Sequence, residues 1–195
     1  MLHIQEDARE VAENESPVAM AVDVVTLPCG REVTLYVGNL AAVCDEATLL
    51  AHNITSTLNV SLNITVPPMQ FADGMHVRRA NVGLIDGGGN IASHMAGAVL
   101  ALHGLLTQAS PGKPYYPAHR YGNVMVNCRG GRSRSVTVLA VYMTLMNPER
   151  WSDLNAAISH IRTLRGNADH YPLEPMIMMG QRLVSEGSLK NLLTI

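Results

Sequence analysis

The chain has 195 residues, of which 47% are hydrophobic and 15% are charged, and its formal net charge is −2. This length and composition fit one globular domain and exclude an intrinsically disordered chain. Because the charge is close to neutral, there is no basic excess for nucleic acid, and an anion site would need a local cluster of basic residues.

The N-terminal sequence is polar and acidic over residues 1–17 and lacks the basic start and apolar run of a signal peptide. We expect a flexible or loosely docked leader there, followed by a single domain over residues 18–195. No apolar stretch approaches the roughly 20 residues that span a bilayer. A cytoplasmic location is the simplest expectation, although an effector delivered without a cleavable signal would show the same features.

The first half of the chain reads as strands around one short helix. Strands are predicted over 22–28 and 32–37, around a turn that contains Gly30, because β-formers flank a turn signal there. A short helix is expected to begin near Asp45, and a further strand rich in Ile, Val and Thr covers 54–62.

A strand over 76–85 is then stopped by the sequence Asp86-Gly-Gly-Gly. Asn90 is a candidate N-cap for a helix that runs to about Gln108. The apolar residues of this segment recur at steps of three and four, as expected for one helix face; they are Ile91, Met95, Val99, Leu102 and Leu106.

The last third begins with a short buried strand over 124–126, followed by an apolar helix over 133–146. Ser152 is expected to cap the next helix, which ends at Gly166, and a final helix begins near Pro175. Alternating strands and helices predict an α/β fold, with a central, mostly parallel sheet flanked by helices.

The chemistry is expected at the junction between strand 124–126 and the helix that follows it. Gly130 and Gly131 allow the backbone to curl so that successive N–H groups converge, and the helix N-terminus adds its positive dipole end. Arg134 can grip two phosphate oxygens with its planar guanidinium. Cys128 lies six residues earlier, at the base of the predicted anion cradle.

A thiol in such a place is suited to be a nucleophile. The pKa of a free cysteine is about 8.5, and helix N-termini and nearby cations lower it to about 3.5–7.5. The alternative is a structural cysteine beside a solvated arginine-rich turn. It leaves unexplained why Arg129, Arg132 and Arg134 are crowded together with no anion between them.

The segment Val126–Met143 resembles the signature loop and following helix of the dual-specificity protein phosphatases, whose pattern is His-Cys-x-x-Gly-x-x-Arg-Ser/Thr. Leu35–Asp45, Ile54–Val60 and Trp151–Ile158 resemble further parts of that family, so the likeness covers about residues 33–183. It implies a domain that hydrolyses phosphate monoesters through a cysteinyl-phosphate intermediate, with no metal or other cofactor. A phosphate or sulfate ion would occupy the loop.

The resemblance also assigns roles. A two-step reaction needs a group that gives and later takes a proton. Asp86 matches the family's acid at the end of a strand, while Asp73, which precedes its strand, is the weaker candidate. Ser135 matches the hydroxyl that bonds to the cysteine sulfur, and Ser133 is expected to face the loop backbone.

The whole loop, comprising Arg129, Gly130, Gly131, Arg132, Ser133 and Arg134, is expected to bind the substrate phosphate. The family has histidine before the cysteine, whereas this chain has Asn127. That histidine helps to order the loop and to ionise the thiol, so its replacement leaves open a phosphate-binding pseudophosphatase.

Nothing in the chain resembles the tyrosine-recognition loop of the large tyrosine-specific enzymes. We therefore expect a phosphoprotein substrate carrying phosphotyrosine, phosphoserine or phosphothreonine. Arg129 and Arg132 make the loop basic, as in phosphatidylglycerophosphate phosphatases, so a phospholipid or phosphoinositide is the alternative. Cys29 or Cys44 could pair with Cys128 on oxidation, although both are expected to be small buried residues.

Overall fold

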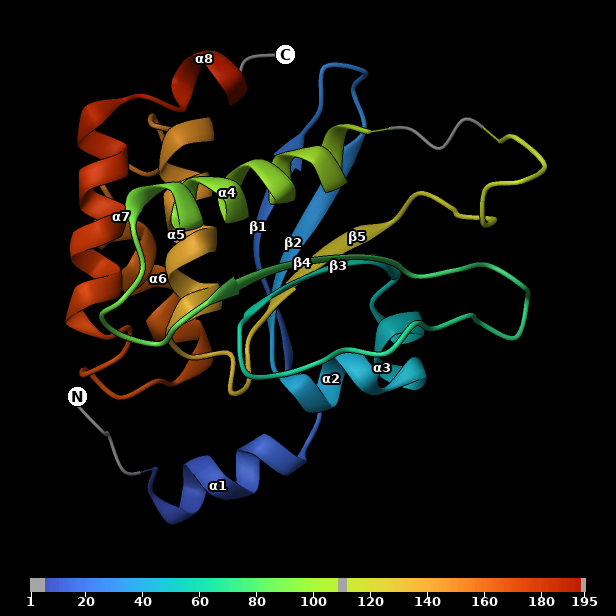
Figure 1. Ribbon diagram of the computed structural model, residues 1–195, viewed down its shortest axis with the longest axis horizontal. Coiled ribbons are helices and arrows are strands. Elements are labelled where there is room, and N and C mark those ends of the chain that lie inside the picture. Colours follow the sequence, from blue (N-terminus) through green and yellow to red (C-terminus); the bar gives the residue numbers. More distant parts are fainter. Residues whose placement is uncertain (1–5, 109–111, 194–195) are drawn as a thin grey trace.

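Figure 1 shows a computed structural model of the chain, which describes residues 6–108 and 112–193. Five strands form one sheet in the order β1-β2-β5-β3-β4, in which β1 and β2 are antiparallel and all other neighbours are parallel. The strands are β1 (Ala19–Thr26), β2 (Glu32–Gly38), β3 (Ile54–Ser61), β4 (Arg78–Leu84) and β5 (Asn123–Asn127). The mostly parallel α/β fold predicted from the sequence is confirmed.

Helices cover both faces of the sheet (Figure 1). One face carries α4 (Ala92–Thr107), α5 (Arg134–Met146) and α6 (Leu154–Arg165), with α7 (Glu174–Glu186) packed on α5. The other carries α2 (Leu40–Cys44) and α3 (Glu46–Ala51). Two further helices are α1 (Ala8–Glu15), which precedes the sheet, and α8 (Lys190–Leu193) near the C-terminus. No helix among the described residues is both long and apolar enough to cross a membrane.

The central strand β5 shows why both faces need helices. Val124 and Val126 belong to the large core formed with α4 to α7, whereas Met125 belongs to the smaller core under α2 and α3. Successive side chains of a strand point to opposite faces, so a continuous apolar run must be covered on both sides. The strand is therefore buried on both faces, and a loop leaves its carboxyl end towards α5.

That loop joins β5 to α5 in a tight path. Gly131 has a φ of +69°, and a Cβ placed there would lie 2.8 Å from the carbonyl oxygen of Gly38 at the end of β2. Only glycine accepts both the left-handed backbone and this close approach. In open α/β sheets, ligands bind outside the carboxyl ends of the strands, which is where this loop lies.

Several local expectations differ from the structure. Ala8–Glu15 forms a helix within the segment expected to be a flexible leader, and residues 1–5 of that segment lie outside the described residues. Its signal was an N-terminal capping box, in which Asp7 and Glu10 bond each other's backbone N–H. The expectation of a flexible leader is therefore corrected for Ala8–Glu15, which forms a helix.

Two expected helix caps are also corrected. Asp153, and not Ser152, caps α6, because its carboxylate accepts the N–H of Ala156. Asn90 lies outside α4, because its amide instead bonds to the loop that precedes the helix.

Candidate active site

Cys128 directly follows β5 and is only 2% exposed, at the base of a cleft of about 1410 Å³. Its Sγ lies 3.4 Å from the hydroxyl of Ser135, in the first turn of α5. Burial raises the pKa of the Cys128 thiol and Asp86 opposes ionisation as well. The Arg134 guanidinium and the Ser135 hydrogen bonds outweigh both and leave that pKa below its usual value. The expected contact between Ser135 and the sulfur is present.

Arg134 is 5% exposed and is held between the loop and the ends of two strands. Its Nη1 donates to the Asn63 side-chain oxygen at 2.8 Å and to the carbonyl oxygen of Leu84 at 3.3 Å. Its Nε lies 3.5 Å from a carboxylate oxygen of Asp86 and makes no hydrogen bond to another described residue. A rigid guanidinium with an unsatisfied donor is suited to bind an anion.

Asn63 belongs to this site, although no motif in the sequence indicates it. Its one signal was position, because it follows β3 at the carboxyl edge of the sheet.

Asp86 follows β4 and comes to the same loop. Its Oδ1 accepts a hydrogen bond of 2.7 Å from the hydroxyl of Ser133, which in turn accepts the N–H of Leu173 at 3.2 Å. Ser133 was expected to face the loop backbone, but its side chain instead links the Asp86 carboxylate to the signature loop. Asn90 closes the turn after Asp86, since its amide bonds to both backbone groups of Ile85.

The weaker acid candidate lies elsewhere. Asp73 pairs with Arg120 and accepts the N–H of Met75, and it does not line the cleft. The structure therefore brings Asp86, and not Asp73, together with Cys128 and Arg134.

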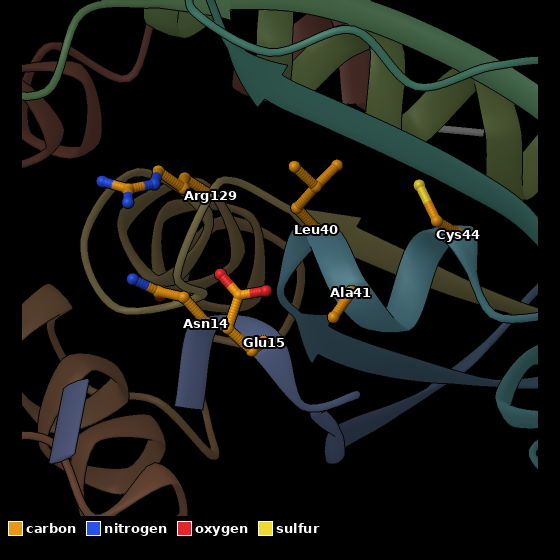
Figure 2. A pocket seen from close by; sticks show the side chains of 6 residues that line it. All are labelled: Asn14, Glu15, Leu40, Ala41, Cys44 and Arg129. Atoms are coloured by element: carbon orange, nitrogen blue, oxygen red, sulfur yellow. The ribbon is translucent and has the colours of Figure 1, made fainter. Parts of the chain in front are cut away.

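Asn127 is fully buried, and neither polar atom of its side chain bonds to another described residue. The structure thus shows no hydrogen bond through which Asn127 would order the loop. Cys29 and Cys44 are exposed, contrary to the expectation that both are buried, and neither lines the cleft. Figure 2 shows Cys44 in a separate small pocket with Leu40, Ala41 and Arg129.

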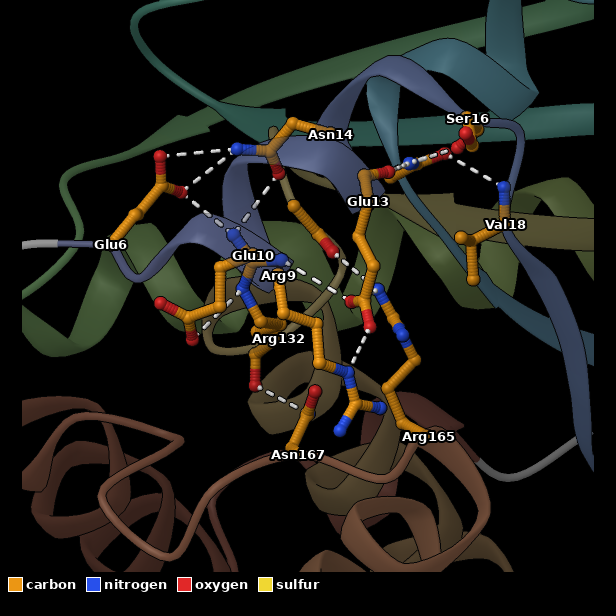
Figure 3. A network of polar contacts seen from close by, with 12 residues as sticks. Glu6, Arg9, Glu10, Glu13, Asn14, Ser16, Val18, Arg132, Arg165 and Asn167 are labelled. Carbon is orange, nitrogen blue, oxygen red and sulfur yellow. Dashed lines mark hydrogen bonds and ion pairs between the residues drawn. The ribbon is translucent and has the colours of Figure 1, made fainter.

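The arginines of the loop differ in the exposure and the surroundings of their side chains. Arg129 lines the cleft with a side chain that is 53% exposed. Arg132 was expected to face a substrate phosphate, but its side chain is only 5% exposed and is surrounded by carboxylates of the N-terminal segment (Figure 3). Within residues 6–108 and 112–193, no three His, Cys, Asp or Glu side chains are grouped so that they could hold a metal.

No protein-family model matches the chain. The fold matches the phosphatase domain of Yvh1 from Chaetomium thermophilum, with a TM-score of 0.63, 23% identity, and coverage of 80% of this chain and 93% of that domain. It also matches DUSP15, with a TM-score of 0.60, 19% identity, and coverage of 87% and 94%. The chain therefore has the fold of the dual-specificity phosphatases.

A third match is the human tyrosine phosphatase-like serine/threonine/tyrosine-interacting protein. Its TM-score is 0.56 and its identity 16%, with 85% of this chain and 97% of that chain covered. The same fold thus occurs in a protein that its own name describes as phosphatase-like.

Proposed function

We propose that this chain is a phosphate monoester hydrolase of the dual-specificity type, acting on phosphotyrosine and on phosphoserine or phosphothreonine in proteins. One observation carries the proposal: the Cys128 thiol, whose pKa is lowered, shares a cleft with Arg134 and with a carboxylate, Asp86, bonded to the same loop. Perturbed groups that converge in a cleft are typical of catalytic sites.

In the first step, the Cys128 thiolate attacks phosphorus and the bond from phosphorus to the bridging oxygen breaks. Asp86 gives its proton to the departing oxygen, while Arg134 binds two of the remaining phosphate oxygens. The products of this step are the dephosphorylated hydroxyl side chain and a phosphate covalently bound to Cys128.

In the second step, the Asp86 carboxylate takes a proton from water, and the resulting oxygen attacks the same phosphorus. The sulfur–phosphorus bond breaks, inorganic phosphate forms, and the thiolate returns. The Ser135 hydroxyl, 3.4 Å from the sulfur, stabilises that thiolate as it departs.

The cleft supports a protein substrate. It has a volume of about 1410 Å³, and its walls include the segment after β4, residues 169–173 between α6 and α7, and the start of α7. A lipid head group with a second phosphate is less well supported, because Arg132, one of the two arginines expected to receive it, is buried against carboxylates.

Binding without turnover is the second candidate function. Asn127 favours it, since a buried amide without a partner does not supply the ordering attributed to the histidine at this position. The match to a phosphatase-like interacting protein adds support.

Hydrolysis of p-nitrophenyl phosphate and of phosphopeptides by the purified full-length chain and by Cys128→Ser decides between the two. The hydrolase predicts release of phosphate by the wild type and none by the variant. Equal rates from both proteins across the pH range would refute it, and phosphopeptide binding that is lost in Arg134→Met would then establish the binding function.

A further inference from the structure

The N-terminal segment places three carboxylates against the signature loop. Glu6 precedes the N-cap of α1, whereas Glu10 and Glu13 lie within the helix at a spacing of three residues, which puts them on one side of it. The capping box fixes the start of this helix. The carboxylates therefore reach the loop from a structured element (Figure 3).

Arg132 is the main partner of these carboxylates. Its Nη2 lies 2.7 Å from Glu6, its Nε 3.7 Å from Glu10 and its Nη1 3.6 Å from Glu13. A Cβ on Gly130 would lie 2.7 Å from the Arg132 guanidinium, so this side chain passes close over Gly130. Arg132 is thus directed to α1, and although it borders the cleft its guanidinium is paired with carboxylates there.

Three more arginines belong to the cluster. Arg165 binds Glu13 at 3.0 Å and the carbonyl oxygen of Gly130 at 3.2 Å, and Arg129 lies 3.3 Å from Glu6. Arg9 also binds Glu13 at 3.0 Å, so three carboxylates meet four guanidinium groups and offset most of their positive charge. The loop that the sequence presents as strongly basic carries little net charge at its outer rim.

Hydrogen bonds between the Asn39 side chain and the backbone hold α1 in this position. The Asn39 amide donates to the carbonyl oxygens of Glu13 and Ser16 at 2.9 and 2.8 Å, and its oxygen accepts the N–H of Val18. Leu40, the next residue, donates its N–H to the carbonyl oxygen of Arg129. The segment at the end of β2 therefore joins α1 to the signature loop.

We propose that Glu6 and α1 form a specificity element that restricts the cleft to substrates with a single phosphate. This rests on the proposed function of the same site. Glu6 and Arg129 both line the cleft beside the signature loop. A second phosphate near the first would meet the Glu6 carboxylate, and it would find Arg129 and Arg132 already paired with carboxylates.

The test compares two peptides of one sequence, one with phosphotyrosine alone and one with an additional phosphoserine two positions away. Their dissociation constants are measured in the Cys128→Ser background, so that the readout does not depend on turnover. We expect the second phosphate to give no gain in affinity there. We expect a gain of about fivefold when Glu6→Gln is added at low salt, because a carboxylate is removed and two guanidinium groups are released.

Glu32→Gln is the matched control, because it removes one exposed carboxylate at the start of β2, at the other end of that strand from the loop. It should leave the ratio of the two affinities unchanged. A double variant, Glu6→Gln with Glu13→Gln, should increase the ratio further, and high salt should reduce it.

An equal ratio of the two affinities in Cys128→Ser with and without Glu6→Gln, with both peptides bound, would overturn the specificity role. The proposed function fails on a different result, namely no hydrolysis of p-nitrophenyl phosphate by the chain with Cys128 intact.

Discussion

The hydroxyl of Ser133 offers a sharp test of how the acid is held in place. It donates to Asp86 at 2.7 Å, accepts the N–H of Leu173 at 3.2 Å, and is 1% exposed. Ser133→Ala removes the bond from the signature loop to Asp86, and it leaves that carboxylate with Arg134, 3.5 Å away, as its remaining partner in the loop.

The size of the effect follows from the kind of bond. A hydrogen bond to a charged group contributes about 1.5–3 kcal/mol, and each 1.4 kcal/mol is a factor of about ten in rate. Because Arg134 still holds the Asp86 carboxylate in part, we expect a loss at the lower end of this energy range, which corresponds to a fall of about tenfold in kcat. KM should change little, because Ser133 holds the acid and not the substrate.

Steady-state kinetics on p-nitrophenyl phosphate and on a phosphotyrosine peptide measure this effect. The loss should be larger on the peptide, whose more basic leaving oxygen needs the proton more. Thr144→Val is the matched control, because Thr144 carries a buried hydroxyl on α5, the helix that follows Ser133, and donates it to the carbonyl oxygen of Ala140, away from Asp86. A kcat for Ser133→Ala equal to that of the control, while Asp86→Asn is impaired, would refute the reasoning.

Three further predictions concern the same site. Asp86→Asn should lower kcat by about 10²–10⁴-fold and flatten the dependence of kcat on pH. The loss of kcat should be smaller on p-nitrophenyl phosphate than on phosphotyrosine, and equal losses on both substrates would contradict the role of Asp86 as the acid. Because the pKa of Cys128 is lowered, its alkylation by iodoacetamide, followed by peptide mapping, should reach its plateau at lower pH than in an unfolded peptide, and Arg134→Met should move the plateau to higher pH. An unmoved plateau would exclude the guanidinium as the cause. Gly131→Ala should lower Tm by several degrees, at about 2–4 °C for each kcal/mol of lost stability. Gly112→Ala should lower Tm less, because Gly112 has a similar positive φ but no neighbouring atom close to an added Cβ. Equal falls in Tm would mean that the close approach to Gly38 is unimportant.

The parts of the site that the sequence predicts best are those set by local order along the chain. An apolar strand, a turn with glycines and an apolar helix lead directly to β5, the loop and α5. The family resemblance indicated Asp86, and the structure brings it to the loop because parallel strands have their carboxyl ends at one edge of the sheet.

The orientation of Arg132 could not be predicted in this way. It is set by Glu6, which lies 126 positions earlier, and by α1, whose docking depends on contacts with Asn39. A charged side chain beside a catalytic loop can face either a substrate or another part of the chain, and only tertiary structure distinguishes the two. The capping box at Asp7 and Glu10 was the local signal that the acidic segment would be helical.

The hydrogen-bond partners of side chains within the site could not be predicted from the sequence either. Ser133 could bond to the backbone or to Asp86, and Asn63 could lie anywhere on the loop after β3, because short polar side chains have many possible local partners. Asn90 was expected to cap a helix and instead closes the turn after Asp86.

The most direct test of the proposed chemistry is to look for phosphate on Cys128. Wild-type protein is mixed with p-nitrophenyl phosphate, quenched in acid within milliseconds, digested and analysed by mass spectrometry. We expect phosphate on the peptide that contains Cys128 and a longer-lived adduct in Ser135→Ala, because the departing thiolate loses its hydrogen bond. Hydrolysis without phosphate on that peptide in either protein, or with phosphate on another residue, would contradict it.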